Sequence, residues 1–456
     1  MNIKKAFRSA ALLVTVFALS ACEVINPGPI QDEFLVREES REGLVNGSQR
    51  RLNEGIGWIG YTGALVTRQI MPGGQTGAYG HNVLEQGGFL QPGGRGGQFN
   101  DAQQGRFIAE TALKLFAESE DPVDSEIVAQ ANVWAGFSNR LLGENWCEAV
   151  IDGSELLPGS DYLRRAEEQF SAALALNPGE TLRMAATAGR ASVRAFLGDW
   201  GGAASDAGAV PNSFDYYVAS DANVAATRNT IMWANGRQPY LAFTMWNTYY
   251  GPQPDMAAGG APIRASGYYQ ETGDPRAEWF EDPNFPWSNA SLLGYGQTPW
   301  FNQTKYDDPN DGFRVASGRE MRLIEAEAQL SNGNWQAAMT TINNLRATYT
   351  TNETMLHPGG MPLEPRDAMS LEGAWTYLKR ERAIELFLEA RTLGDQRRWE
   401  ENNTPGDLEL PDFERISEIF SDNERGTLIN NQARLCFDVP NSERERNPNI
   451  PELGGT

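Results

Sequence analysis

Apolar residues recur every three or four positions along much of the chain. Residues 104–118 (QGRFIAETALKLFAE) and 126–142 (EIVAQANVWAGFSNRLL) show this spacing with few charges, and residues 41–57 show it with Leu44 and Leu52 among arginines and glutamates. The spacing places the apolar side chains on one face of a helix, which is stable when that face packs against a neighbour. These segments are therefore predicted to be helices with one buried face.

Further along the chain, helices are predicted to come in pairs. Residues 161–178 carry small and apolar side chains on one face and stop at an Asn-Pro dipeptide, and residues 182–211 form two helices broken at Gly-Asp-Trp (198–200). Residues 319–346 repeat this pattern, with Gly-Asn-Trp (333–335) at the break. Such pairs resemble tetratricopeptide repeats, in which small residues let the paired helix approach and proline ends the unit. Two separated copies predict a mainly α-helical scaffold of stacked helix pairs.

The helical pattern is interrupted by two loop-rich insertions, at about 58–100 and 212–318. The first is rich in glycine, and the second holds many aromatic residues among Gly, Pro and Asn. Long irregular segments inside a compact protein are usually functional. Aromatic rings stack on the apolar faces of sugar rings, and neighbouring amides and carboxylates bind the hydroxyls. The candidate ligand-binding residues are Trp58, Tyr61, Tyr79, Trp233, Trp246, Tyr249, Tyr250, Trp279, Trp287 and Trp300. The alternative for each ring is that it fills a small core of the insertion itself.

The N-terminus has the features of a secretory signal. Three basic residues precede an apolar run from Ala10 to Leu19, and Leu-Ser-Ala-Cys follows, ending at Cys22. The apolar run is too short to span a membrane as a mature helix. The last four residues resemble a bacterial lipobox, so residues 1–21 are predicted to be a signal peptide, Cys22 to carry lipid, and residues 22–40 to be a flexible tether. The alternative is an ordinary secretory signal with a coincidental cysteine.

Charge and composition exclude several classes of protein. The chain has 456 residues, with 38 Lys and Arg against 60 Asp and Glu, and a formal net charge of −22. A field of this sign repels phosphate backbones, which argues against nucleic-acid binding. Only His81 and His357 are present, without a zinc-binding spacing, so we expect no metal site, no cofactor and no catalytic residues of that kind. No later segment has 18 consecutive apolar residues, so a lipid is the expected membrane anchor.

Two motifs resemble ligand loops but lack the context that would support them. Residues 55–60 satisfy GxGxxG, but they follow a polar run and no strand–helix alternation surrounds them, so a nucleotide site is rejected. Residues 307–312 resemble a calcium loop, but Pro309 occupies a ligand position and the required glutamate is missing, so a turn is predicted.

Cys147 and Cys436 remain after Cys22 is assigned to the lipid. An even pair of cysteines in an oxidising compartment favours a disulfide, which would tie the early helices to the C-terminal tail. The alternative is two unpaired thiols that are buried as small apolar residues.

Several motifs together resemble the SusD/RagB family of outer-membrane nutrient-binding lipoproteins. They are the lipobox, GREMRLIEAEAQL (318–330), INNLR (342–346), ERAIELFLEARTLGDQRRW (381–399) and the tail LCFDVPNSERERNPNI (435–450). The chain departs from the usual pattern in its two later cysteines and in its Pro-Glu-Leu-Gly-Gly ending.

This resemblance implies a fold, a role and a location. Residues 41–456 would form a single domain of about four tetratricopeptide-like helix pairs with a variable loop region that holds the ligand. The protein would be lipid-anchored and surface-exposed at the outer membrane, would capture oligosaccharides or peptides, and would deliver them to a SusC-like TonB-dependent barrel. Members are not enzymes. The alternatives are an envelope scaffold of the tetratricopeptide type without a small ligand, and a glycan-processing enzyme, although nothing singles out a pair of catalytic carboxylates.

A dense run of charges marks the last predicted helix, residues 372–391, and the residues after it. Glutamates four residues apart on a helix repel each other unless arginines lie between them. We therefore expect a charge network that locks this helix against the others, the alternative being a contact surface for the transporter. The residues are Arg380, Glu381, Arg382, Glu385, Glu389, Arg391, Asp395, Arg397 and Arg398.

Overall fold

The computed structural model describes residues 35, 37–73, 79–80, 90, 92–236, 240–251, 267–292, 296–408 and 435–452. The predicted signal peptide, Cys22 and His81 lie outside the described residues. Within the described part of the chain, no helix combines the length and the apolar character that crossing a bilayer requires.

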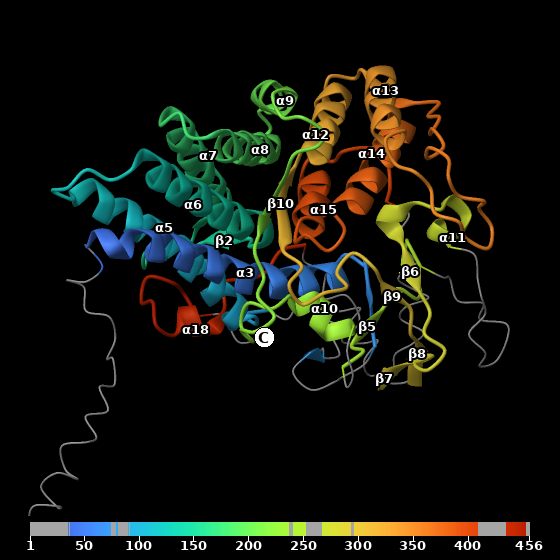
Figure 1. Cartoon of the computed structure of the whole chain (residues 1–456), viewed down its shortest axis with the longest axis horizontal. Helices are drawn as coiled ribbons and strands as arrows, with labels where there is room; N and C mark the ends of the chain where they lie inside the picture. Colours follow the sequence, from blue (N-terminus) through green and yellow to red (C-terminus); the bar gives the residue numbers. More distant parts are fainter. Residues whose placement is uncertain are drawn as a thin grey trace, which may run out of the picture.

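The fold is mainly helical, as the sequence predicts (Figure 1). The α-helices are α3 (Arg41–Val66), α5 (Gly96–Glu118), α6 (Ser125–Asn145), α7 (Ser160–Ala175), α8 (Glu180–Leu197), α9 (Trp200–Gly208), α10 (Thr230–Asn235), α11 (Tyr268–Thr272), α12 (Gly318–Ser331), α13 (Trp335–Arg346), α14 (Leu371–Glu385), α15 (Thr392–Glu401) and α18 (Asn441–Arg444). In the part of the chain that the structure describes, the 3₁₀ turns η1 (Glu38–Ser40) and η3 (Pro275–Ala277) accompany them.

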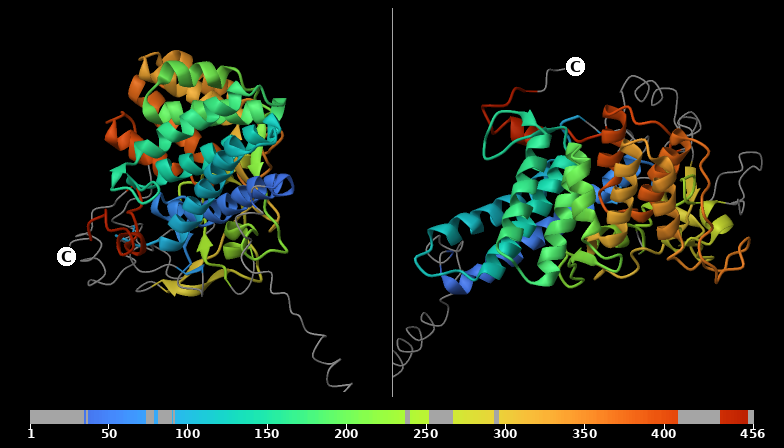
Figure 2. Two further views of the ribbon diagram at one scale, coloured as in Figure 1. Left: turned by 90° about the vertical axis from the view of Figure 1, so that its left-hand side faces the viewer. Right: turned by 90° about the horizontal axis from the view of Figure 1, so that it is seen from above.

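The helices stack in chain order, which confirms the predicted helix-pair scaffold. Helix α5 packs on α6, α6 on α7, α7 on α8, and α8 on α9; α9 then packs on α12, which contacts α13 and α14. Seen from above, these helices form a continuous row (Figure 2). Long helix α3 runs beneath the row and packs mainly against α5 and α6 (Figure 1). The two copies of the predicted repeat are therefore neighbours through the contact between α9 and α12.

The Gly-Asp-Trp break ends one helix and begins the next, as the sequence predicts. Gly198 has φ +81°, a left-handed conformation that stops α8 at little steric cost. The Asp199 side chain accepts a hydrogen bond from the backbone N–H of Gly202 and so caps α9. Gly333 takes the same left-handed conformation, with φ +75°, between α12 and α13.

One phenylalanine sets how closely three of these helices approach. Phe170 of α7 is fully buried and lies against Gly136 of α6 and Gly189 of α8. A Cβ atom at Gly189 would lie 2.4 Å from a Phe170 ring carbon, and one at Gly136 would lie 2.6 Å from another. The ring therefore occupies the space that these two glycines leave, which is the close packing expected of small residues in a helix-pair repeat.

The strands are short and form antiparallel pairs. They are β1 (Met71–Pro72) with β5 (Phe243–Thr244), β2 (Glu148–Ala149) with β3 (Leu157–Pro158), β4 (Asp215–Val218) with β10 (Phe313–Ser317), β6 (Trp279–Phe280) with β9 (Asn302–Gln303), and β7 (Trp287–Leu292) with β8 (Gly296–Pro299). In the longest register, Phe313 lies opposite Val218 and Ser317 opposite Asp215. Because β4 and β10 stand at the two ends of the predicted insertion, the insertion leaves and rejoins the scaffold at one place.

Two predicted boundaries are wrong. Helix α3 continues to Val66, so Trp58 and Tyr61 lie on a helix and the first loop-rich segment begins later than residue 58. The last predicted helix, 372–391, ends at Glu385, and Leu388 and Ala390 have φ values of 58° and 60°. The backbone leaves the helix here because its polar groups find distant partners. The Leu388 carbonyl accepts from the Tyr306 hydroxyl, and the Ala390 carbonyl accepts from the Asn145 amide.

The charge run forms the buried network that the sequence predicts, and this network attaches the insertion to α14. Glu385 is 3% exposed and accepts hydrogen bonds from Arg314 at 3.0 Å and Arg319 at 3.1 Å. Arg276 of the insertion lies 2.9 Å from Glu381 and 3.4 Å from Glu385. Burial by itself raises the pKa of Glu385, but Arg314 and Arg276 more than offset it, so the pKa is lowered and the carboxylate stays charged.

A second part of the network joins α15 to the rest of the scaffold. Asp395 accepts two hydrogen bonds from Arg382, at 2.9 and 3.0 Å, and one from Arg398 at 3.0 Å. Arg391 pairs with Glu144 of α6 at 2.7 Å and with Glu320 of α12 at 2.8 Å. Arginines alternate with carboxylates throughout, which offsets the cost of burying each charge.

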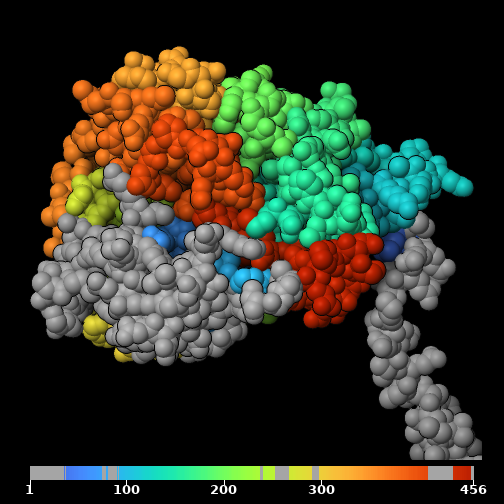
Figure 3. Space-filling view, turned by 180° about the vertical axis from the view of Figure 1, so that it is seen from behind, coloured from blue at the N-terminus to red at the C-terminus, as the bar shows by residue number. Residues whose placement is uncertain are grey.

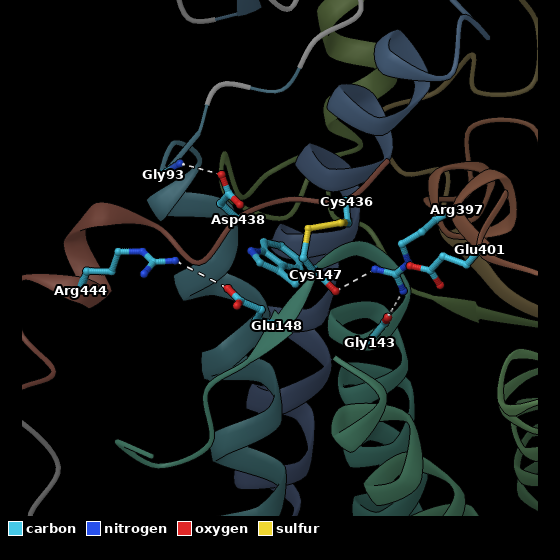
Figure 4. Close-up of a disulfide and its surroundings, with 10 residues drawn as sticks. Gly93, Gly143, Cys147, Glu148, Arg397, Glu401, Cys436, Asp438 and Arg444 are labelled. Atoms are coloured by element: carbon cyan, nitrogen blue, oxygen red, sulfur yellow. Dashed lines mark hydrogen bonds and ion pairs between the residues drawn. A yellow bond between two sulfur atoms is a disulfide. The ribbon is translucent and has the colours of Figure 1, made fainter. Parts of the chain in front are cut away.

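Cys147 and Cys436 form a disulfide, with their Cα atoms 5.2 Å apart. Figure 4 shows it at the end of α6, where the C-terminal segment passes. The Cys147 N–H donates to the Phe437 carbonyl at 3.0 Å, and the Phe437 N–H donates to the Asn145 carbonyl at 2.7 Å. In Figure 3 the C-terminal segment, in red at the lower right, lies against the teal residues that follow α6.

The two rejected ligand motifs have structural roles. Residues 55–60 lie within α3, where Gly55 faces Ala102 of α5 and Gly57 faces Thr230 of α10. Residues 307–312 form the predicted turn, because the Asp311 carboxylate accepts hydrogen bonds from the N–H groups of Asp307 and Asp308. Among the described residues, no group of three or more His, Cys, Asp or Glu side chains is placed to hold a metal ion.

Candidate functional site

The structure divides the aromatic candidates by exposure. Those buried in the core are Tyr61, Tyr79, Trp246, Tyr250, Trp279 and Trp300, and those that stay partly exposed are Trp58, Trp233, Tyr249 and Trp287. The residues in the second set keep part of their surface exposed, so they remain the candidates for ligand contact. A residue in the first set positions others or fills the core.

Candidates from the two predicted insertions meet in one place. We define this aromatic cluster as Trp58, Tyr79, Arg228, Trp233 and Tyr240. The rings of Trp58 and Tyr79 are stacked, with centroids 5.3 Å apart and planes 14° apart. Tyr240 meets Tyr79 edge-on, with centroids 4.5 Å apart. The Arg228 guanidinium lies over the Trp233 ring, 3.7 Å from its centroid. Aromatic rings and a positively charged guanidinium therefore lie next to each other in this cluster.

Separate elements bring the members of the aromatic cluster together. Trp58 lies on α3, Trp233 on α10, and Tyr79 and Tyr240 on irregular backbone. Helix α10 packs on α3, so Trp233 is carried towards the helix that bears Trp58. The hydroxyl of Tyr61, one turn after Trp58, donates to the Tyr79 carbonyl at 2.9 Å and holds Tyr79 in place. The buried candidate Tyr61 therefore acts as a support.

The aromatic cluster offers hydrogen-bond donors beside its apolar faces. Arg228 donates from Nη2 to the Tyr79 hydroxyl at 3.2 Å. Its Nε is buried and has no hydrogen-bond partner among the described residues. Burial raises the pKa of Tyr79 although Arg228 opposes the shift, so the phenol is neutral and can donate. The arrangement can stack against an apolar ring face and donate hydrogen bonds to oxygen atoms next to it.

The other buried candidates hold the insertion together. The Tyr250 hydroxyl donates to the Ala383 carbonyl of α14 at 2.7 Å. The Trp300 indole donates to the Asn235 side chain at 2.7 Å. Trp279 meets Phe301 edge-on, with centroids 5.1 Å apart. These contacts explain why such large rings are buried in a segment with little regular structure.

Sequence reasoning did not identify Arg228 and Tyr240 as site residues. Arg228 follows the β4 strand in a turn-rich segment, and nothing in its local sequence marks it. Tyr240 lies in the aromatic insertion, and its contact with Tyr79 is what distinguishes it from the insertion's other rings. Two further exposed rings, Phe280 and Phe285, lie on or near β6 and were also not singled out.

Comparison with known proteins shows which proteins this architecture is similar to. The model of the SusD family matches residues 237–452. A SusD superfamily protein from Bacteroides vulgatus has a TM-score of 0.57 at 14% identity, over 91% of this chain and 98% of that one. A surface glycan-binding protein A from Bacteroides uniformis has a TM-score of 0.56 at 13% identity, over 91% and 99%. A SusD-like carbohydrate binding protein from Bacteroides vulgatus has a TM-score of 0.54 at 15% identity, over 79% and 83%.

At these identities the solved structures establish the fold. No curated protein matches the chain. The family model covers the C-terminal part of the insertion, the second helix-pair copy, the charge network and the tail, and the shared fold extends over most of the rest. Residues 237–452 therefore match the SusD family, also known as the SusD/RagB family, and the chain shares the fold of SusD superfamily structures.

Proposed function

We propose that this protein is a binding protein for saccharides and that the aromatic cluster contacts the ligand. The observation that carries the proposal is the stacked pair of Trp58 and Tyr79 next to a guanidinium that lies on Trp233. Proteins of the same fold are named as glycan-binding and carbohydrate-binding proteins, which supports a ligand of this class.

The chemistry of the aromatic cluster suits a sugar better than a charged ligand. A pyranose ring has an apolar C–H face that an indole can cover, and hydroxyls at its edge that need hydrogen-bond partners. Trp58 and Trp233 are partly exposed, and the partly exposed Arg228 supplies guanidinium donors. Proteins of the same fold are named as binding proteins, so we propose binding without catalysis.

The proposed role in the cell is capture and delivery. The protein would be anchored to the outer membrane by lipid on Cys22 and would pass an oligosaccharide to a SusC-like TonB-dependent barrel. A peptide ligand is the alternative at the same site. The competing role is an envelope scaffold of the tetratricopeptide type, for which the row of helix pairs would be the functional surface.

Substitution of the partly exposed indoles tests the proposed ligand. The full chain in detergent is screened against neutral polysaccharides and peptides by affinity electrophoresis. W58A and W233A are compared with Y217A, because Tyr217 is 49% exposed and lies on β4 outside the aromatic cluster. An aromatic contact contributes about 0.5–1.5 kcal/mol, so each cluster variant is expected to bind the polysaccharide about 3- to 10-fold more weakly. Unchanged retardation of both variants contradicts the proposed site, and retention by peptides alone contradicts the ligand class.

A pull-down tests the proposed role. The full-length protein is isolated from its own outer membrane in mild detergent, and the proteins that copurify are identified by mass spectrometry. A stoichiometric TonB-dependent barrel supports capture and delivery. Recovery of envelope-assembly proteins without such a barrel favours the scaffold. The same material reports on the anchor, because C22S is expected to leave the membrane fraction if Cys22 carries the lipid.

A further inference from the structure

A ligand-sized pocket lies on α5, away from the aromatic cluster. Its volume is about 590 Å³, and its walls come from α5, the turn at 150–153 and the residues around α18. It shares no residue with the aromatic cluster. In Figure 1, α18 and α10 lie below different parts of α3.

An exposed aromatic ring flanked by amides forms one wall of this pocket. Phe107 is 56% exposed and lies in the middle of α5, on the face of the helix that is turned to solvent. Gln104 and Asn100 precede it by three and seven residues, so the three side chains share one face of α5. Both amides are exposed, and neither side chain hydrogen-bonds to another described residue. The wall therefore presents an apolar face with donors and acceptors available beside it.

The charges in this pocket balance. Asp152 accepts a hydrogen bond from Arg106 at 2.8 Å through Oδ1, while its side chain remains 57% exposed. Glu443 and Arg446 face the pocket from the C-terminal segment. Two acids and two arginines sum to zero, so the pocket does not favour a polyanion or a polycation. Carboxylates and guanidinium groups that are partly solvated are suited to binding pairs of hydroxyls.

Hydrogen bonds and the disulfide hold the pocket walls in position. The Tyr162 hydroxyl accepts from the Gln103 amide at 2.7 Å and donates to the Val150 carbonyl at 2.8 Å, which joins α5 to the turn. Asn449 donates to the Gly153 carbonyl at 2.8 Å, which joins the turn to the C-terminal segment. The Cys147–Cys436 bond ties down the start of that segment (Figure 4). A pocket already ordered loses little entropy when a ligand binds.

From these features we infer that the α5 pocket is a second saccharide-binding site, in which Phe107 stacks on the sugar and the surrounding amides and charged groups bind its hydroxyls. The ligand class is a neutral oligosaccharide or polysaccharide, and the inference rests on the proposed function in that the same protein is taken to bind glycans. Two separated contacts on one chain let it hold a long glycan at two points, which strengthens retention of polymers more than that of short oligomers.

The experiment compares variants of the full chain in detergent. F107A and Q104A alter the α5 pocket, W58A/W233A alters the aromatic cluster, and L356A is the control, because Leu356 is 59% exposed and lines neither site. Retardation on gels containing each of a panel of neutral polysaccharides is measured, and calorimetry with a short oligosaccharide of the retained polymer gives the number of sites. Circular dichroism verifies that each variant is folded.

The second site predicts a specific pattern. F107A is expected to weaken retention about 3- to 10-fold and to reduce the calorimetric stoichiometry from two to one, while L356A matches the unaltered protein. Adding F107A to W58A/W233A is expected to abolish retention. If F107A keeps full retention and stoichiometry while W58A/W233A loses them, the α5 site is wrong and the proposed function stands. If the unaltered chain binds no polysaccharide, both fail. If F107A loses a copurifying protein but no glycan, the pocket is a protein contact and the inference is overturned.

Discussion

Removing the Glu327 carboxylate should cost a large part of the stability of the protein. This side chain of α12 is fully buried and binds Arg398 and Trp399 of α15. Its two oxygens accept from the Arg398 guanidinium at 2.5 and 2.7 Å, and Oε1 also accepts from the Trp399 indole at 2.8 Å. Arg398 and Trp399 lie more than 70 residues away in sequence, so the contact joins α12 to α15.

The size of the effect follows from what E327A leaves behind. Arg398 is 4% exposed. It keeps its ion pair with Asp395 at 2.9 Å but loses the bidentate contact with the Glu327 carboxylate, and the Trp399 N–H loses its acceptor. Breaking one side of a buried ion pair costs about 3–5 kcal/mol, because the remaining charge stays buried. That is a large share of the roughly 5–15 kcal/mol that stabilises a typical domain. E327Q keeps an acceptor oxygen and the side-chain volume, so its loss should be smaller.

The matched control is E325A. Glu325 lies two residues earlier on the same helix, its side chain is 23% exposed, and its ion pair is with Arg322 at 3.3 Å. A pair of this kind contributes at most about 1 kcal/mol. Urea unfolding followed by circular dichroism, with the disulfide intact, measures both variants. If E327A and E325A differ by less than about 1 kcal/mol, the inference that the Glu327 contact bears this stability is refuted.

Three further results are expected. The free energy of unfolding in urea should be about 1–3 kcal/mol lower for G189A, because the added Cβ would meet a phenylalanine ring carbon at 2.4 Å. G43A, whose added Cβ has no atom within 4 Å, should be neutral or more stable by up to about 1 kcal/mol. Equal losses in the two variants would contradict this packing. C147S/C436S should be less stable by about 2–4 kcal/mol, since the bond closes a sequence separation of 289 residues, and two free thiols in the denatured, unreduced protein would exclude the bond. In thermal melts, stability should fall as the pH drops below 4.5, the ordinary pKa of a glutamate. The buried carboxylates of the network have lowered pKa values in the fold, so they take up protons when the protein unfolds. A melting midpoint that stays constant down to about pH 3 would contradict this prediction.

Features that depend on neighbouring residues in the chain were predictable from the sequence. The helical spacing, the left-handed glycine at 198 and the cap at Asp199 follow from local conformation, so the sequence predicts the helix pairs. The charge network was also predictable, because glutamates four residues apart need arginines between them, but its arginines come from distant segments such as those of Arg276 and Arg314.

What only the tertiary structure decided depends on groups far apart in the chain. Local spacing extends the last helix to residue 391, yet it ends at Glu385, because carbonyls beyond it are satisfied by side chains from the insertion and from α6. The aromatic composition of the insertion marks it as a binding region, but it does not separate rings that fill the core from rings that face solvent. That division, and the meeting of Trp58 and Tyr79 with Arg228, depends on which surfaces remain uncovered once the helices have packed. Burial is a property of the assembled fold, and periodicity along the chain predicts which side chains are buried only in regular helices.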